Sequence, residues 1–142
     1  MGVPHAIQIG SVGELGVSYQ LALRGWSVFT PMVPDNGHKF DLLINKGKKT
    51  HRIQVKTTNT LDKQRQNRYV LTASCSHRGS PKRKSLYTRD DCDFIVASVT
   101  PEEWYFVFPV ERVSVLKISI PLHLPHGHFS TMHKDAWELL DG

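Results

Sequence analysis

Four polar residues have types and a spacing that suit hydrolytic chemistry. Gln54 and Lys56 alternate with apolar residues in the segment HRIQVKTTN, so both point to one face of an expected strand. Asp41 lies in the preceding apolar segment, and Glu14 lies in an amphipathic segment further upstream. Carboxylate and amide oxygens suit a hard divalent cation such as magnesium. A lysine beside the cation can orient or help to deprotonate an attacking water, so these groups together are what phosphodiester hydrolysis needs.

A hairpin between two apolar strands would bring these residues together. The segment KFDLLIN predicts a strand with Asp41 on one face, and KGKK predicts a tight basic turn centred near Gly47. Antiparallel pairing around that turn sets Asp41 opposite either Ile53 or Gln54, and the sequence leaves this register open. With the Gln54 register, Asp41, Gln54 and Lys56 share one face of the sheet.

The segment GSVGELGVSYQLALRGW, residues 10–26, predicts an amphipathic helix. Ser11 has the character of an N-cap, Glu14 three residues later completes a capping-box pattern, and Gly25 suits the C-terminal end. An apolar stripe at helical spacing is formed by Leu15, Tyr19, Ala22 and Leu23. We expect this stripe to pack on the sheet, which would place Glu14 at its edge and within reach of the polar cluster.

The rest of the chain predicts further strands and polar loops. Strands are expected in residues 26–31, 67–74, 92–100 and 103–109, with a shorter one within 110–120. Residues 75–91 and 122–133 are expected to be loops, and residues 134–140 a closing helical turn. This order indicates a mixed α/β or α+β domain built on one sheet, with residues 1–142 as a single domain.

The composition is typical of a globular protein that meets a polyanion. The 142 residues are enough for a hydrophobic core, and the net charge of +5 with a sequence pI of about 9.4 favours a polyanionic partner. No apolar run approaches the roughly 18 residues of a membrane span. The two cysteines lack CxxC spacing and the N-terminus lacks a signal-peptide pattern. We therefore expect a cytoplasmic or nucleoid-associated protein.

The segments GELGVSYQLALRGWSVF, FDLLI and RIQVKTT together resemble the PD-(D/E)XK nuclease superfamily. The likeness is closest to group I intron-associated homing endonucleases, which have QxK in place of (D/E)xK, and more distant to archaeal Holliday junction resolvases. It covers residues 10–58 well and continues less sharply through SLYTRDDCDFIVASV and WYFVFPVERV. The resemblance implies a restriction-endonuclease-like α/β core, with a mixed central sheet flanked by helices.

The resemblance also implies a role for each polar residue. Asp41 would be the principal metal ligand, with further oxygens from Gln54 and the backbone carbonyl of Val55. Lys56 would position or activate the nucleophilic water, and Glu14 would complete the site directly or through water. The implied cofactor is Mg²⁺ or Mn²⁺. Because glutamine replaces the commoner acidic residue, the site would have less negative charge and a weaker metal affinity.

Basic residues outside this set suggest contacts with DNA. The candidates are Arg52, Lys63, Arg65, Arg78, Lys82, Arg83 and Lys84. The densest stretch, HRGSPKRK, suits an arm that follows phosphates, or simply a solvated loop. The expected partner is double-stranded or branched DNA. One small domain holds one active site, so double-strand cleavage would need a homodimer or homotetramer.

Several functions fit this sequence. A site-specific homing endonuclease comes first, and a Holliday junction resolvase or a mobile-element or phage repair nuclease comes second. Gln54 also motivates a catalytically inactive DNA-binding module, and an interaction subunit without a nucleic-acid role is a further alternative. Four histidines within residues 123–133 could bind zinc, but their spacing matches no zinc finger, so surface histidines on a loop are the simpler interpretation.

Overall fold

A five-stranded mixed sheet forms the centre of the protein in a computed structural model that describes residues 6–32, 39–77 and 80–142. The elements are α1 (Ala6–Leu23), β1 (Ser27–Phe29), β2 (Leu42–Lys46), β3 (Lys49–Thr58), β4 (Arg68–Thr72), β5 (Ser74–His77), β6 (Ser80–Leu86), β7 (Phe94–Val99), β8 (Trp104–Pro109), η1 (Val110–Arg112), β9 (Lys117–Pro121), α2 (Phe129–Met132) and η2 (Trp137–Asp141). The strand order is β1-β2-β3-β7-β8, in which β3 and β7 are parallel and the other pairs antiparallel. The predicted mixed α/β architecture is confirmed.

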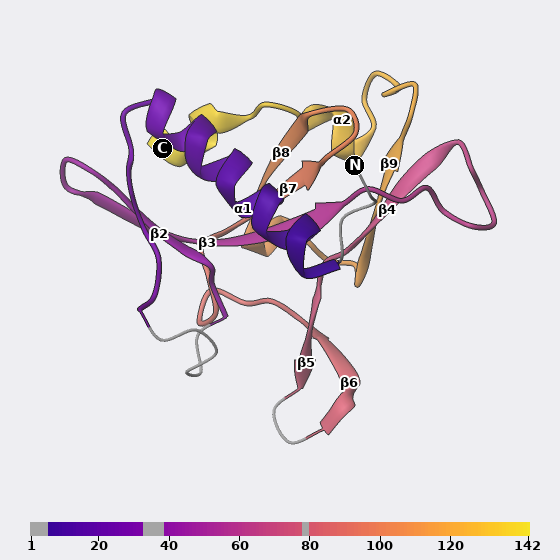
Figure 1. Cartoon of the computed structure of the whole chain (residues 1–142), viewed down its shortest axis with the longest axis horizontal. Coiled ribbons are helices and arrows are strands. Elements are labelled where there is room, and N and C mark those ends of the chain that lie inside the picture. The colour runs from indigo at the N-terminus through magenta and orange to yellow at the C-terminus, as the bar shows by residue number, and fades with distance from the viewer. Residues whose placement is uncertain (1–5, 33–38, 78–79) are drawn as a thin grey trace.

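Different elements cover the two faces of this sheet (Figure 1). Helix α1 and the C-terminal η2 pack on one face, where Val17 and Leu140 join the core side chains of β2, β3 and β7. The two-stranded β4–β9 ladder packs on the other face, where Leu71 and Ile118 contact a second core cluster. Every residue of β7 is buried, as expected for a strand covered on both faces.

Helix α1 differs from its prediction at one end and agrees with it at the other. Ser11 lies inside the helix, so the N-cap and capping-box prediction is wrong. Gly25 has a φ of 90°, its N–H donates to the Ala22 carbonyl over 3.0 Å, and the Trp26 N–H donates to the Leu21 carbonyl over 3.1 Å. This Schellman arrangement confirms the predicted glycine end. No helix in the described part of the chain is long and apolar enough to cross a membrane.

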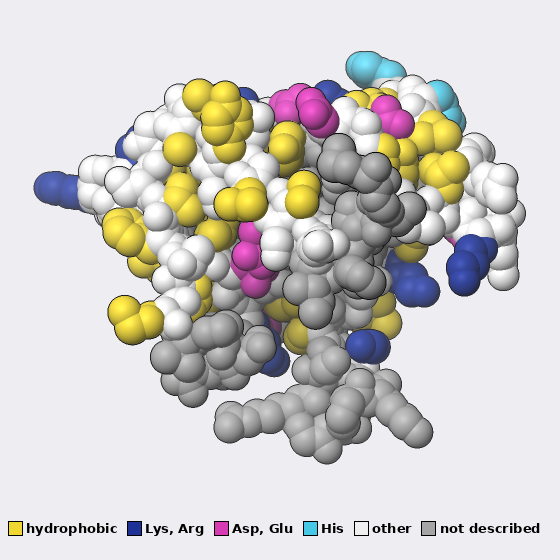
Figure 2. Space-filling model, in the orientation of Figure 1, with side chains coloured by type: hydrophobic (Ala, Val, Ile, Leu, Met, Phe, Trp, Pro, Cys, Tyr) yellow, Lys and Arg dark blue, Asp and Glu magenta, His cyan; other side chains and the backbone are white. Residues whose placement is uncertain are grey.

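The apolar stripe predicted to pack on the sheet is exposed instead. Its large members are 71% exposed at Leu15, 63% at Tyr19 and 63% at Leu23, and Ala22 is exposed as well. Hydrophobic side chains are visible on the outer surface of the molecule where α1 lies (Figure 2). The buried face contains Gly13, Val17 and Leu21. The prediction was wrong because it followed the largest apolar side chains, whereas the helix approaches the sheet through small residues.

Two predicted loops contain regular structure. The basic segment 75–91 includes most of a hairpin, in which β5 pairs with β6 and which projects from the rest of the molecule (Figure 1). The segment 122–133 contains the single-turn helix α2. His128 caps its N-terminus, because the His128 Nδ1 accepts from the Ser130 N–H over 3.1 Å. Local polar composition indicated loops, but cross-strand pairing and a side-chain cap order both segments. The other predicted strands and the closing helical turn form in their expected segments, and none extends more than two residues beyond them.

Candidate active site

The hairpin of β2 and β3 places Asp41 at the position opposite Gln54. Gly47, with a φ of 63°, is the first residue of a two-residue turn, which fixes the register of the ladder. The ladder ends at the pair of Leu42 with Ile53, and the Asp41 N–H still donates to the Ile53 carbonyl over 2.8 Å. Of the two registers that the sequence left open, the structure has the one that puts Asp41 and Gln54 on one face.

The Asp41 carboxylate accepts hydrogen bonds from Gln54 and Val55. Its Oδ2 accepts from Gln54 Nε2 over 2.9 Å and from the backbone N–H of Val55 over 2.9 Å. The same Gln54 nitrogen donates to the Val55 carbonyl oxygen over 3.4 Å. A carboxylate oxygen and a carbonyl oxygen therefore converge on one nitrogen, and oxygens that converge in this way suit a hard cation.

The Lys56 amine lies in a half-buried place beside this pair. Its Nζ donates to the Ser74 carbonyl over a long 3.5 Å and lies 5.1 Å from the centroid of the Tyr87 ring. Among the described residues, no carboxylate forms an ion pair with it. Burial lowers the pKa of Lys56, although the negative charge of Asp41 acts in the opposite direction. At a given pH, a larger fraction of the Lys56 amine is therefore neutral than for an ordinary lysine.

Gly13 allows helix α1 to bring Glu14 to the site. A Cβ at Gly13 would lie 1.8 Å from the Thr57 Oγ1, so only glycine permits this approach of α1 to β3. Glu14 and Lys56 line the same cleft, which has a volume of about 360 Å³. Burial and, second, the negative charge of Asp41 raise the pKa of Glu14. Two carboxylates held in one negative field favour a bound cation.

The assembled donors fit a hard divalent cation. They are the carboxylates of Asp41 and Glu14, the Gln54 amide and the Val55 carbonyl, an all-oxygen set once the amide turns its oxygen inward. No group of three or more His, Cys, Asp or Glu side chains within the described ranges could hold a metal ion. Two carboxylates would therefore be completed by neutral oxygens and water, as magnesium permits.

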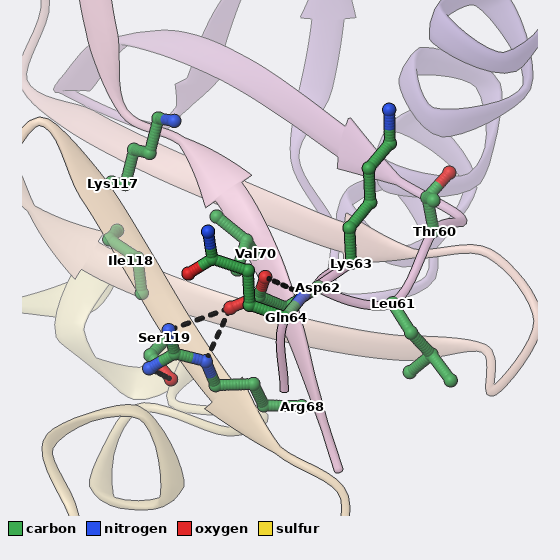
Figure 3. Close-up of a pocket in the computed structure, with 10 residues that line it drawn as sticks. All are labelled: Thr60, Leu61, Asp62, Lys63, Gln64, Arg68, Val70, Lys117, Ile118 and Ser119. Atoms are coloured by element: carbon green, nitrogen blue, oxygen red, sulfur yellow. Dashed lines mark hydrogen bonds and ion pairs between the residues drawn. The ribbon is translucent and has the colours of Figure 1, made fainter. Parts of the chain in front are cut away.

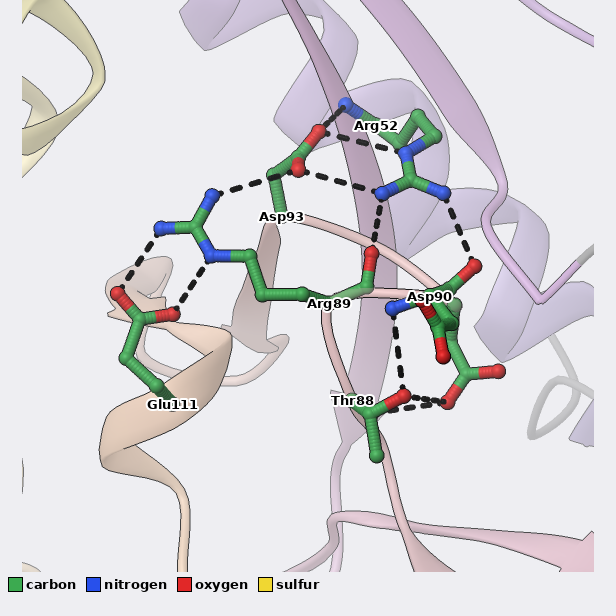
Figure 4. Close-up of polar contacts among 7 residues, drawn as sticks. Arg52, Thr88, Arg89, Asp90, Asp93 and Glu111 are labelled. Atoms are coloured by element: carbon green, nitrogen blue, oxygen red, sulfur yellow. Dashed lines mark hydrogen bonds and ion pairs between the residues drawn. The ribbon is translucent and has the colours of Figure 1, made fainter.

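Arg52, two residues before Gln54, is bound within the protein (Figure 4). Its guanidinium pairs with Asp93 Oδ1 at 3.3 Å and donates to the backbone carbonyls of Asp90, over 3.0 Å, and Arg89. Its backbone N–H donates to Asp93 Oδ2 over 2.8 Å, and Arg89 in turn pairs with Glu111 at 2.9 Å. These contacts fix the loop before β7 against β3. Arg52 therefore has a structural role. Its contact with DNA stays a prediction.

Three of the other candidate DNA contacts have side chains that the structure describes, and all three are exposed. Lys63 and Arg65 are exposed in the connection between β3 and β4, and Lys84 is exposed on β6. Arg78 lies outside the described residues, and the side chains of Lys82 and Arg83 on β6 also lie outside the description. For all of these residues, contact with DNA stays a prediction.

The histidine-rich segment does not lie wholly on the surface. His123 and His126 are exposed, and His128 caps α2. His133 is only 3% exposed, and its Nδ1 lies 2.7 Å from the Phe129 carbonyl oxygen. The surface-loop interpretation is therefore wrong for His133, which belongs to the packing around α2.

Three contributors to the site were missed in the sequence. Gly13 had a signal, because glycines at positions 13 and 16 of a strongly helical segment indicate a close approach. Ser74 and Tyr87 had none, because nothing local relates them to Lys56. They meet it only through the packing of distant segments.

Comparisons with known proteins agree with this fold. A family model described as PD-(D/E)XK endonuclease matches residues 5–140. One of the similar solved structures is described as a bacterial homing endonuclease, I-Ssp6803I. The two chains have a TM-score of 0.79 and 22% sequence identity, with 96% of this chain and 93% of that chain covered. No curated protein matches the chain by sequence. The structural likeness confirms the predicted restriction-endonuclease-like fold.

Proposed function

The chain belongs to the PD-(D/E)XK endonuclease family, and from this premise we propose that it hydrolyses DNA phosphodiester bonds with magnesium or manganese, as a site-specific homing-type endonuclease. Residues 1–142 would act as a single nuclease domain. The observation that best supports the proposal is the Asp41 carboxylate bound to the Gln54 amide and the Val55 N–H, with Lys56 and Glu14 beside it.

The chain's own residues divide the work of hydrolysis. Asp41, Glu14, Gln54 and the Val55 carbonyl would hold the cation, which when bound supplies Lewis-acid stabilisation of charge on the attacked phosphate. Lys56 orients the attacking water and accepts its proton, a role that its lowered pKa favours. The water oxygen forms the new bond to phosphorus, the ester P–O bond breaks, and the leaving oxygen takes a proton from solvent.

Two observations favour the homing type. Most of the family has an acidic residue at the position of Gln54. The intron-associated group has glutamine there, as this chain does. The solved structure with 22% identity is also described as a homing endonuclease. The net charge of +5 supports a nucleic acid as the partner. A homing enzyme selects a sequence, whereas a junction resolvase selects a branched shape, so substrate choice separates them.

Cleavage assays on matched substrates test this function. The protein is incubated with a randomised duplex library, a four-way junction and an RNA duplex, with magnesium, manganese or a chelator. We expect metal-dependent cutting of a sequence subset of the DNA library and no cutting of RNA. Preferential cutting of the junction would indicate a resolvase. Binding without cutting would indicate an inactive DNA-binding module, and neither binding nor cutting would indicate an interaction subunit.

Cutting both strands requires two active sites, so we propose that the protein acts as a homodimer or a homotetramer. Helix α1 supports self-association through its exposed apolar stripe, which the exposed side chain of Val12 extends. Glu14 is the one charged residue of the segment Ala6–Leu23, although the chain has a net charge of +5. A face without cations is poorly suited to DNA and well suited to a second copy of itself.

Charges placed on the stripe test this association. A variant with Leu15→Lys and Tyr19→Lys should sediment as a monomer and retain its thermal unfolding temperature, because both side chains are exposed. Ser114→Lys with Val115→Lys is the matched control, since both residues are exposed in the segment between η1 and β9, outside α1. An assembly unchanged in the double variant would exclude this face of α1 as the interface.

A further inference from the structure

A second hollow continues from the cleft along the surface. It lies between the connection after β3 and the β4–β9 ladder and has a volume of about 560 Å³ (Figure 3). Its lining includes Leu61, Val70 and Ile118. Thr60 and Val70 line both this groove and the cleft that contains Glu14 and Lys56. The two hollows are therefore neighbours that share part of their walls.

The described lining of the groove has a net positive charge. Asp62 and Arg68 form an ion pair whose charges cancel, and two lysines remain. Asp62 Oδ2 accepts from both Arg68 Nε and Nη2, over 2.9 Å and 2.7 Å, and Asp62 Oδ1 accepts from the Gln64 N–H over 3.0 Å. The Gln64 N–H and then the Arg68 side chain hold the pKa of Asp62 below its usual range, so it stays ionised and its charge cancels that of Arg68. Among the described residues that line the groove, the other charged ones are Lys63 and Lys117, and both are exposed.

The two lysines point the same way. Figure 3 shows their ammonium ends directed away from the Asp62–Arg68 pair, with Gln64 and Val70 between them. An open groove with two separated positive charges over an uncharged floor suits a chain of phosphates better than one compact anion. Lysine contacts a phosphate as a point charge, and the apolar side chains of the floor can contact sugars.

We propose that this groove binds the DNA backbone beside the phosphate that is cut, with Lys63 and Lys117 each contacting one phosphate. The proposal rests on the proposed function, because it needs DNA in the adjoining cleft. The groove would then orient the strand across Glu14 and Lys56, through a contact that is independent of sequence.

The salt dependence of DNA binding tests the proposal. The double variant Lys63→Gln with Lys117→Gln is titrated with a fluorescent duplex of mixed sequence, in chelator so that no cutting occurs. We expect affinity to fall by about tenfold or more at about 0.1 M salt. We also expect the slope of log K against log salt to become shallower by about 2, one unit for each lost phosphate contact.

Two controls make the result specific. Lys49→Gln with Arg112→Gln removes two exposed charges outside the groove, and should change the slope by less than about 0.5. Lys63→Arg with Lys117→Arg keeps both charges and should restore binding. A groove variant that matches the Lys49 and Arg112 control would overturn the proposal while leaving the nuclease function intact. A wild-type protein that does not bind DNA would overturn both.

Discussion

Arg52 and Lys56 lie four residues apart on one face of β3, yet the protein uses their charges in opposite ways. Arg52 is bound by the Asp93 carboxylate and by two backbone carbonyls (Figure 4). Lys56 meets one carbonyl at 3.5 Å and the Tyr87 ring at 5.1 Å. One end of this face therefore fixes the fold, and the other end keeps an incompletely bound amine beside a cleft.

The carboxylates of the two regions have pKa values shifted in opposite directions. Although burial alone would raise the pKa of Asp93, hydrogen bonds from the Arg52 backbone and guanidinium hold it below its usual range. Burial and the nearby charge of Asp41 raise the pKa of Glu14. A bound network has its charges balanced by its own residues, whereas the cleft has charges that a cation would balance. Such imbalance is typical of functional sites.

Asp41→Asn should have the largest effect, and it tests the cleft side of the comparison. Asparagine keeps an oxygen that can accept from Gln54 and Val55, but it removes the negative charge that attracts a cation. We expect cleavage to fall by at least about 10³-fold, or ~4 kcal/mol. The thermal unfolding temperature should change by less than about 2 °C. Metal titration by calorimetry gives an independent readout, and near-normal metal binding with near-normal cleavage would contradict the assignment.

Asp93→Asn makes the corresponding change in the network and should act on stability. It leaves the half-buried Arg52 guanidinium without its carboxylate, which should lower the free energy of unfolding by about 2 kcal/mol. Urea denaturation measures this loss. Asp135→Asn is the control. The Asp135 carboxylate is 51% exposed, against 16% for Asp93, so its loss should change stability by less than about 0.5 kcal/mol. Equal losses in the two variants would remove the distinction between the regions.

Tyr87 should control how well Lys56 is placed. Tyr87→Leu removes the ring beside the amine. Because a cation–π contact contributes about 1 kcal/mol, we expect kcat to fall by roughly fivefold. The limb of the pH–rate profile that belongs to Lys56 should move to lower pH, because the ring favours the charged amine. Tyr87→Phe keeps the ring and should behave as the wild type. A Phe variant as impaired as the Leu variant would instead assign the effect to the hydroxyl.

The pH dependence of stability should differ between wild type and Asp93→Asn by a smaller amount. Asp93 has a folded pKa below its ordinary 3.8, so its stabilising effect is fully present above that value. This effect is lost as the pH falls through the folded pKa, because the unfolded chain takes up the proton first. We expect the free energy of unfolding to fall less steeply below about pH 4 in the variant. Parallel curves for the two proteins would show that Asp93 does not contribute to acid unfolding.

The candidate active site was largely predictable from sequence because most of its residues belong to one hairpin. Gln54 and Lys56 are fixed on one face by strand alternation, and Gly47 fixes the turn that sets Asp41 opposite Gln54. The sequence narrowed the register to two choices, and the ladder selected one of them. The placement of Glu14 at the edge of the buried face of α1 followed the expectation, although that face was assigned incorrectly.

The network and the orientation of α1 were not predictable because they depend on distant packing. The parallel pairing of β3 with β7 brings Asp93 to Arg52 across a long separation in sequence, and no local pattern indicates it. For α1, large apolar side chains indicated one face, while Gly13 determined the other by its contact with Thr57. The sequence correctly indicated a helix with an apolar stripe. The prediction buried that stripe, whereas the structure exposes it and buries the face with Gly13.

The most direct measurement makes one substitution at both ends of the β3 face and follows metal-dependent DNA cleavage together with thermal unfolding. Lys56→Met should abolish cleavage and leave the unfolding temperature unchanged or about 2 °C higher, because it removes a charge that burial disfavours. Arg52→Met should lower the unfolding temperature by several degrees and retain cleavage at temperatures where the protein is folded. The account would be contradicted if Lys56→Met still cut DNA, or if Arg52→Met lost cleavage while its stability was unchanged.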